Sequence, residues 1–598
     1  MKIILALSTL LSTFYISAQT NTYKISFENA LHHEAVINAT FPDLKMDTVS
    51  FRMSRTSPGR YALHEFAKNV YGFEARDSKG NILKVYRPNP YEWQVTGHDG
   101  TINIEYILFA NRGDGTYSQV DETHAHLNIP ATFMFAPMLS QRKIEVTFKV
   151  REDLNWKVAT QLPLVSGTTY MAPNLYYFMD SPTEISDYML RSFQVDGKTV
   201  NLALHHNGTQ EEADTYFEKV QKVVLTEKEV YGELPNFDYG SYTFLACYIP
   251  NASGDGMEHR NSTIVTSTRS LEDGGMENNI GTVSHEFFHC WNVERIRPKS
   301  LEPFDFEAAN MSGELWFAEG FTSYYTNLIL CRAGLISPKE YVDGLAGTFN
   351  YVWNSPARKF FNPIEMSYQA PFVDAATSVD PVNRENTFIS YYSYGSILGL
   401  ALDLSLREKG LTLDNFMKLV WENYGKTEIS YTVETLHTAL NQFAGKEFGD
   451  SFFNNYIHKS SMPDYGSLLQ SVGVVLEQQG IEPYFGAYVS VNNDGSGATI
   501  LGNTKMGSPA YLAGMDNGDV ILNVNGIPFS EGQKFEDYLM QFQMGDSLKV
   551  NFTRFGEPKT TNLVLIPNPD YSISLMEDKD QIPTSKMMGQ RKQWLKQE

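Results

Sequence analysis

The stretch VSHEFFHCWNVERIRP, residues 283–298, places two histidines four residues apart, with a glutamate directly after the first. Apolar residues recur around them at three- and four-residue intervals, which is typical of an amphipathic helix. Four helical residues correspond to about 400° of rotation, so His285 and His289 point the same way one turn apart. Two imidazole nitrogens then reach one metal ion, and Glu286 lies where a carboxylate can hold and deprotonate water. The alternative is an amphipathic helix carrying two ordinary histidines.

A catalytic metal of this kind needs a third protein ligand, and the acidic residues downstream are Glu294, Glu302, Glu307, Glu314 and Glu319. Glu294 lies five residues past His289, roughly 140° round the helix, and faces elsewhere. Glu319, in ELWFAEGFTSYYTNL, shares a stripe with apolar residues, so its carboxylate would be buried without compensation unless a cation pairs with it. The alternative partner is Arg295 or Arg297. Two histidines and a glutamate with one open position suit Zn²⁺.

Length and charge set the class of protein. The 598 residues are too many for one compact core and predict several domains. Lys and Arg number 48 against 70 Asp and Glu, a net charge of −22, which argues against sequence-independent binding to nucleic acid or to anionic lipid. The three cysteines are an odd number scattered along the chain, so we expect small buried side chains and no disulfide framework.

The N-terminus predicts export. Residues 1–18 have the pattern of a secretory signal, with cleavage expected after Ala18. The pattern consists of a lysine at position 2, the apolar run IILALSTLLSTFYI and the small residues of SAQT around the cleavage site. Serines and threonines interrupt the run, which is shorter than the ~20 residues that span a bilayer. We therefore expect a periplasmic or secreted protein with no membrane span in the mature chain.

Hydrophobic periodicity predicts a multidomain α+β fold. Residues 19–195 alternate with period two, as in TINIEYILFA and RKIEVTFKV, and predict an antiparallel β domain. Residues 196–473 form a second domain with a helical block over about 281–470. Strands return over 474–567, and the polar residues 568–598 predict a loose tail.

Four motifs in this order, DGMEHRNST, HEFFHCWNVERIRP, LWFAEGFTSYY and SYYSYGSILGLALDL, resemble the glycyl aminopeptidase family. These gluzincin zinc metallopeptidases are related to aminopeptidase N and often carry a PDZ domain. The resemblance covers residues 23–567. It implies a thermolysin-like catalytic domain over 196–473, a PDZ-like domain over 474–567, and one Zn²⁺ per chain. It also implies hydrolysis of N-terminal residues from peptides, preferably small ones such as Gly or Ala.

The resemblance assigns roles to individual residues. Relatives place a Gly-x-Met-Glu-Asn strand before the zinc helix, and its glutamate holds the substrate's α-amino group. DGMEH gives that role to Glu258, with Gly256 and Met257 lining the substrate; the departures are a first Asp and a final His. GGMEN matches the letters better, but its Glu277 comes only a few residues before His285 and leaves no room for a strand, so we prefer Glu258.

A tyrosine on a helix after the third ligand donates to the oxyanion in the relatives, and YSYG gives this role to Tyr392, with Tyr394 where the family usually has lysine. Glu286 would be the general base. The pair in THAHLN, His124 and His126, is more typical of structural histidines than of a second metal site.

The segment YFGAYV, residues 484–489, resembles the PDZ loop that receives a peptide C-terminus; the alternative is a module that braces the catalytic domain. Two rival functions stay open. One is a secreted zinc endopeptidase that uses the PDZ-like domain to recruit substrates, and the other is a peptide-binding scaffold with a degenerate metal site.

Overall fold

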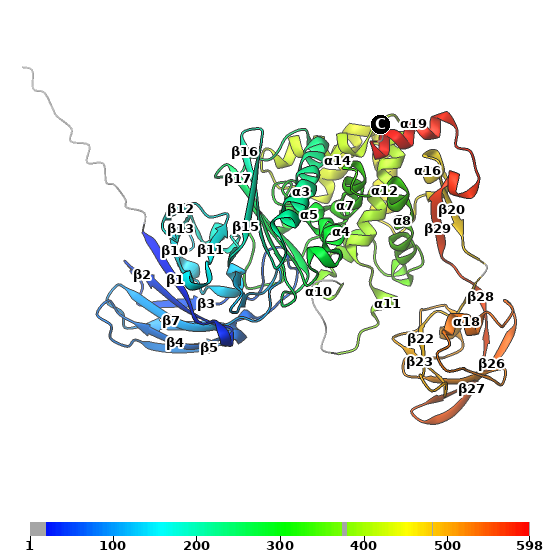
Figure 1. The fold of residues 1–598 in the computed structure, drawn as a ribbon, viewed down its shortest axis with the longest axis horizontal. Coiled ribbons are helices and arrows are strands. Elements are labelled where there is room, and N and C mark those ends of the chain that lie inside the picture. The colour runs from blue at the N-terminus through cyan, green and yellow to red at the C-terminus, as the bar shows by residue number, and fades with distance from the viewer. Residues whose placement is uncertain (1–18, 374–379, 481, 597–598) are drawn as a thin grey trace, which may run out of the picture. The chain divides into compact units, whose positions relative to one another are not determined.

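The computed structural model describes residues 19–373, 380–480 and 482–596 (Figure 1). The predicted signal segment, residues 1–18, lies outside the described residues. The chain forms two compact units: one joins the residues up to Arg55 with Glu65–Tyr188, and the other joins Thr56–His64 with everything from Met189 onward.

The first unit is built from strands, as the period-two alternation predicts. Its largest sheet has the order β12-β13-β10-β1-β2-β7-β4. These strands are β1 (Thr20–Asn29), β2 (Glu34–Phe41), β4 (Val70–Arg76), β7 (Ile102–Phe109), β10 (Lys143–Lys149), β12 (Leu164–Ser166) and β13 (Thr169–Ala172). Every second residue of β2 is buried, which places one face of the sheet on the core. The pairing is antiparallel except between β1 and β10, which run parallel.

Two smaller sheets complete this unit. One contains β3 (Thr48–Arg52), β5 (Lys84–Asn89) and β6 (Glu92–Thr96), and the other contains β8 (Gln119–Val120), β9 (His124–Leu127), β11 (Lys157–Thr160) and β14 (Thr183–Ser186).

The second unit begins with a five-stranded sheet of order β15-β16-β17-β19-β18. Its strands are β15 (Met189–Val195), β16 (Lys198–His206), β17 (Ser241–Tyr248), β18 (Asp255–His259) and β19 (Ser262–Ser267). β15 lies within the range 19–195 predicted for the first domain, but it pairs with β16 and so belongs to the second unit. β18 pairs only with β19 and forms the edge of the sheet.

Helices pack against this sheet and enclose an extensive hydrophobic core. Figure 1 shows α3 (Gln210–Tyr231), α5 (Ile280–Phe288), α7 (Gly320–Arg332) and α12 (Tyr391–Glu408) side by side next to strands β15–β17. Further helices of the block are α6 (Leu315–Ala318), α8 (Pro338–Trp353), α13 (Leu413–Val420), α14 (Val433–Ala444), α15 (Lys446–Phe452) and α16 (Tyr465–Ser471). The predicted helical block and the multidomain α+β fold are confirmed.

A β-rich domain follows the helical block. Its sheet has the order β22-β23-β24-β26-β27, with β22 (Tyr488–Val491), β23 (Ala498–Leu501), β24 (Val520–Val524), β26 (Ser547–Arg554) and β27 (Glu557–Val564). Two short helices, α17 (Pro509–Leu512) and α18 (Phe535–Leu539), accompany the sheet. Phe485, Ile500, Ile521 and Val550 belong to a hydrophobic core of its own, so this segment has the anatomy of a separate small domain.

The prediction of a loose tail over 568–598 is wrong. β29 (Tyr571–Leu575) pairs with β20 (Val474–Gln478), and α19 (Ser585–Leu595) follows. Trp594 is 0% exposed, and its indole N–H donates to the hydroxyl of Tyr324 on α7 at 2.9 Å. The segment is polar on average, but Trp594 and Leu595 anchor it in the helical core.

All three cysteines are buried and unpaired, as expected. In the described part of the chain, no helix combines the length and the apolar character needed to cross a membrane.

Candidate metal and catalytic site

The two histidines and Glu319 converge in the second unit. His285 lies in α5 and His289 follows the last residue of that helix, while Glu319 lies between α6 and α7. The Nε2 atoms of the histidines are 3.2 Å apart. Oε2 of Glu319 lies 3.2 Å from Nε2 of His289 and 3.6 Å from Nε2 of His285. The structure therefore brings together the three ligands predicted from the sequence.

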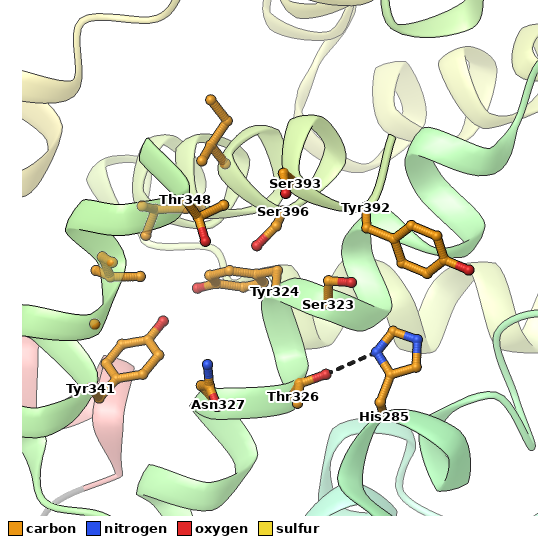
Figure 2. A pocket seen from close by; sticks show the side chains of 14 residues that line it. His285, Ser323, Tyr324, Thr326, Asn327, Tyr341, Thr348, Tyr392, Ser393 and Ser396 are labelled. Atoms are coloured by element: carbon orange, nitrogen blue, oxygen red, sulfur yellow. Dashed lines mark hydrogen bonds between the residues drawn. The ribbon is translucent and has the colours of Figure 1, made fainter. Parts of the chain in front are cut away.

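Hydrogen bonds on the far side of each imidazole orient the rings. Nδ1 of His285 lies 3.1 Å from Oγ1 of Thr326 (Figure 2). Thr326 donates its own hydroxyl hydrogen to the carbonyl oxygen of Thr322 at 3.0 Å, so its oxygen accepts from the His285 N–H. Nδ1 of His289 donates to the carbonyl oxygen of Asn292. Each Nε2 is thereby available as a metal ligand.

The buried carboxylate of Glu319 and the two facing imidazoles favour a bound cation between them. Burial raises carboxyl pKa values, but the facing imidazoles outweigh burial and lower the pKa of Glu319. Burial also lowers the pKa of His289, yet Glu319, Glu258 and Glu286 outweigh it and raise this pKa to about 10. Oε2 of Glu319 is buried with no hydrogen-bond partner among the described residues. Three converging N and O donors, one of them on a buried carboxylate, fit a divalent cation.

The alternative partners for Glu319 are engaged elsewhere. Arg295 donates to the carbonyl oxygen of Cys290 at 2.9 Å and to the side chain of Asn261 at 3.0 Å, and Arg297 pairs with Glu302 at 2.8 Å. The alternative, a core pair between Glu319 and one of these arginines, is therefore absent from the described residues.

Strand β18 packs directly on α5, the helix that contains His285 and Glu286, at Gly256. A Cβ atom on Gly256 would lie 2.1 Å from Oε1 of Glu286, so only glycine fits here without displacement. Glu286 is 6% exposed, and its Oε2 has no hydrogen-bond partner in the described part of the chain. Burial raises the pKa of Glu286 well above its usual range, as suits a group that must accept a proton.

Glu258 lies two residues further along β18. It is 7% exposed, and a carboxylate oxygen falls within 4.8 Å of ligand atoms of Glu286 and His289. Burial raises its pKa. The rival glutamate lies in a different environment, because Glu277 is in the short helix α4 (Met276–Asn278) with a 69% exposed side chain that pairs with Lys219 at 3.2 Å. The structure thus places Glu258, and not Glu277, beside the metal ligands.

Tyr392 reaches the site from the start of α12, with its ring centroid 5.9 Å from that of His285 (Figure 2). Its position is fixed by close contact between α12 and the segment from α6 to α7. A Cβ on Gly320 would lie 2.3 Å from Cα of Gly395, and a Cβ on Gly395 would lie 1.9 Å from the carbonyl oxygen of Trp316. Burial raises the pKa of Tyr392 well above its usual range, so the phenol keeps its proton and can donate a hydrogen bond.

Sequence reasoning missed the segment Thr56–His64. The hydroxyl of Tyr61 donates to Oε1 of Glu319 at 2.8 Å, and Arg60 forms an ion pair with Asp255. Both residues line a cleft of about 260 Å³ that also contains Glu286 and Tyr392. Only the turn-forming Ser-Pro-Gly of RTSPGRYALHEF stands out in this stretch, and that pattern carries no signal of a site.

The histidine pair His124 and His126 is held by hydrogen bonds within the protein. Nδ1 of His124 and Nδ1 of His126 lie 3.2 and 3.1 Å from the carboxylate of Glu184. Their Nε2 atoms lie 3.2 Å from the side-chain oxygen of Gln119 and 2.9 Å from the carbonyl oxygen of Asp114, respectively. All four ring nitrogens have protein partners, as expected for buried polar groups.

Two histidines one turn apart, a glutamate from a following segment, and an adjacent carboxylate define the site of a metal-dependent hydrolase. Comparison with protein families gives three matches. Residues 22–187 match the Peptidase M61 N-terminal domain, residues 278–398 match the M61 glycyl aminopeptidase, and residues 483–565 match a PDZ domain. The resemblance seen in the sequence is confirmed, and the matches support a metallo-aminopeptidase with a PDZ domain.

One solved structure has the same fold over nearly the whole chain. An aminopeptidase N family protein from Idiomarina loihiensis superposes with a TM-score of 0.83 at 24% identity, covering 96% of this chain and 100% of that one. An M1 zinc metallopeptidase variant from Deinococcus radiodurans, bound to Tyr-Ser-Ala, gives a TM-score of 0.45 at 12% identity over 75% of this chain and 95% of that one. A similarity as low as the second bears on neither fold nor function. None of the curated proteins matches the sequence.

Proposed function

We propose that the protein is an exported zinc-dependent aminopeptidase of the gluzincin type that removes single residues from the N-termini of peptides. The observation that carries this proposal is the buried carboxylate of Glu258 beside the cluster of His285, His289 and Glu319. The N-terminal segment, residues 1–18, supports export to the periplasm or beyond.

His285, His289 and Glu319 would hold the zinc ion. Bound there, zinc would act as a Lewis acid toward the substrate carbonyl and lower the pKa of water. Glu286, whose burial raises its pKa, is suited to take a proton from the attacking water and pass it to the leaving amine. Tyr392 keeps its proton and can donate to the oxygen of the substrate carbonyl as negative charge develops there.

The edge strand β18 would align the substrate. Its outer edge has no partner strand in the described sheet, so Gly256 and Met257 can offer backbone groups to an extended peptide. Glu258 would then pair with the α-ammonium group and hold the first peptide bond over the metal.

A small first residue is the expected preference. The segment Thr56–His64 packs against the carboxylate that would bind the amine, because a Cβ on Gly59 would lie 3.0 Å from Oε2 of Glu258 and 2.1 Å from Sδ of Met257. A large first side chain would have to compete with this segment for space, so the crowding favours Gly or Ala.

The deciding experiment compares free and N-terminally acetylated peptides, with and without a chelator. We expect single-residue release from the free peptides only, and none once the metal is removed. Glu258→Ala should lose about 2–5 kcal/mol of transition-state binding, the usual cost of removing one partner of a buried charge pair. The matched control, Glu277→Ala, should keep its activity because this carboxylate is exposed and distant from the site.

Equal cleavage of free and acetylated peptides at internal bonds would replace this proposal with the secreted endopeptidase. One observation favours substrate recruitment by the PDZ-like domain. A groove of about 710 Å³ is lined by residues 484–488 and α18, and also by Tyr351, Ser355 and Glu385 of the helical domain. A peptide C-terminus would bind there beside β22. Peptides ending in a free carboxylate should bind the full chain more tightly than their amidated forms; equal binding would favour a bracing role for this domain.

A further inference from the structure

A second cavity opens beside the metal site, on the side of α7, α8 and α12. It has a volume of about 260 Å³ and includes His285 and Tyr392 in its wall (Figure 2). The same two residues line the cleft that contains Gly256 and Glu286. The cavity therefore meets the catalytic cleft along a shared wall.

The cavity is lined by neutral polar groups. Figure 2 shows the hydroxyl groups of Thr348, Ser393 and Ser396 along one side and that of Tyr341 at the far end. The hydroxyls of Thr348, Ser393 and Ser396 have no hydrogen-bond partner among the described residues. Tyr341 is 3% exposed, and its oxygen is fully buried. Because buried polar groups in proteins almost always have partners, these hydroxyls are suited to a bound polar group.

No Asp, Glu, Lys or Arg side chain lines this cavity within the described ranges, although the whole chain carries a net charge of −22. A charged group placed in the cavity would lose hydration without gaining an ion pair, whereas an amide or a hydroxyl would find several partners.

The position of the cavity tells which part of a substrate would reach it. Glu258 lies against Glu286 and His289, at the C-terminal end of α5. The cavity touches His285, one helical turn earlier. The amine-binding carboxylate and the cavity therefore lie toward opposite ends of the metal-binding turn. A peptide held by its amine at Glu258 would direct the portion beyond the cleaved bond toward the cavity.

We propose that this cavity binds the side chain of the residue that follows the cleaved bond, and that it selects uncharged, hydrogen-bonding side chains such as those of Ser, Thr, Asn and Gln. The inference rests on the proposed aminopeptidase function, because it takes the direction of the substrate from Glu258. It names a substrate class for that function: peptides with a small first residue and a polar, uncharged second residue.

The test uses the zinc-loaded full chain and the dipeptide amides Ala-Ser, Ala-Gln, Ala-Leu, Ala-Lys and Ala-Glu. Ala-Ser and Ala-Gln should be hydrolysed with a kcat/KM at least about tenfold above those of Ala-Lys and Ala-Glu, because a charge gains no partner in the cavity. Alanine para-nitroanilide, whose leaving group has no amino-acid side chain, reports the aminopeptidase activity separately.

Two variants of Thr348 test the residue directly. Thr348→Val removes a hydroxyl with little change of shape and should lower kcat/KM for Ala-Gln by about 2- to 10-fold, the usual effect of one hydrogen bond. Thr348→Asp introduces a charge and should raise the ratio of Ala-Lys to Ala-Gln hydrolysis by about tenfold. Thr438→Val, at an exposed threonine of α14, is the matched control and should change neither quantity.

The outcomes separate the inference from the function on which it rests. Hydrolysis of the nitroanilide together with equal rates for all five dipeptides would overturn the cavity assignment and leave the aminopeptidase standing. An unchanged Ala-Lys to Ala-Gln ratio in folded Thr348→Asp would also overturn it. Failure to hydrolyse both the nitroanilide and the dipeptides would refute the aminopeptidase and the cavity assignment together.

Discussion

Gly256→Ala is expected to abolish most of the turnover while leaving the metal ligands intact. The added Cβ would lie 2.1 Å from Oε1, 2.6 Å from Cδ and 2.8 Å from Cγ of Glu286, so the whole side chain must move and not only its tip. An ordinary contact begins at 3.4 Å, which requires the carboxylate oxygen to retreat by about 1.3 Å. A displacement of about 1 Å at a catalytic group costs on the order of 10²-fold in rate.

The assay compares kcat, zinc content and melting temperature of Gly256→Ala and Gly254→Ala. A Cβ on Gly254 would meet only the carbonyl oxygen of Thr266, at 4.0 Å, so this control should behave like the unmodified protein. Gly256→Ala should keep its zinc and lose about 1–3 kcal/mol of stability through overpacking. If folded Gly256→Ala turns over as fast as Gly254→Ala, then Glu286 is not held against β18 and the reasoning fails.

Four further substitutions test the rest of the site. Glu319→Ala should lose most of its zinc by elemental analysis; full zinc occupancy would point to another ligand. Tyr392→Phe should lower kcat by about 10²–10³-fold with little change in KM, and equal activity would refute the donor role. Tyr61→Phe should weaken zinc binding about 10- to 100-fold in competition with a chelator, because Glu319 loses its hydrogen bond. Gly395→Ala should lower both kcat and melting temperature, because its Cβ would collide with the carbonyl oxygen of Trp316. Unchanged values would mean that α7 and α12 can separate freely.

The convergence of His285, His289 and Glu319 could be predicted from the sequence because the helix sets the geometry of the two histidines locally. His285 and His289 share a face of the helix because of their four-residue spacing. Glu319 could be identified because it is an acidic residue within an apolar helical stripe. The sequence motif alone could not identify Glu258, because DGMEH and GGMEN both contain a Met-Glu pair. The choice between Glu258 and Glu277 depended on the number of residues before His285, because too few follow Glu277 to form a strand that crosses α5. In the structure, Glu277 lies in the short helix α4.

The C-terminal residues show where composition misleads. The segment 568–598 is polar on average, and average polarity predicted a loose tail. Packing depends on particular side chains: Trp594 is fully buried, its indole donates to Tyr324, and Leu595 is buried in the same core. The average polarity of a segment does not reveal which of its apolar residues will be buried against another part of the chain.

Tyr61 could not be predicted for a different reason. It lies 258 residues before Glu319, and no periodicity or spacing connects the two. The chain leaves the first unit after Arg55, contributes Thr56–His64 to the second unit, and returns at Glu65. Two contacts come from the segment Thr56–His64. Tyr61 donates a hydrogen bond to Glu319, and Gly59 packs against Glu258. The range 196–473 predicted for the catalytic domain therefore lacks part of its own site. Under the proposed function, the residues Thr56–His64 would therefore position a metal ligand through Tyr61 and narrow the amine-binding end of the cleft through Gly59.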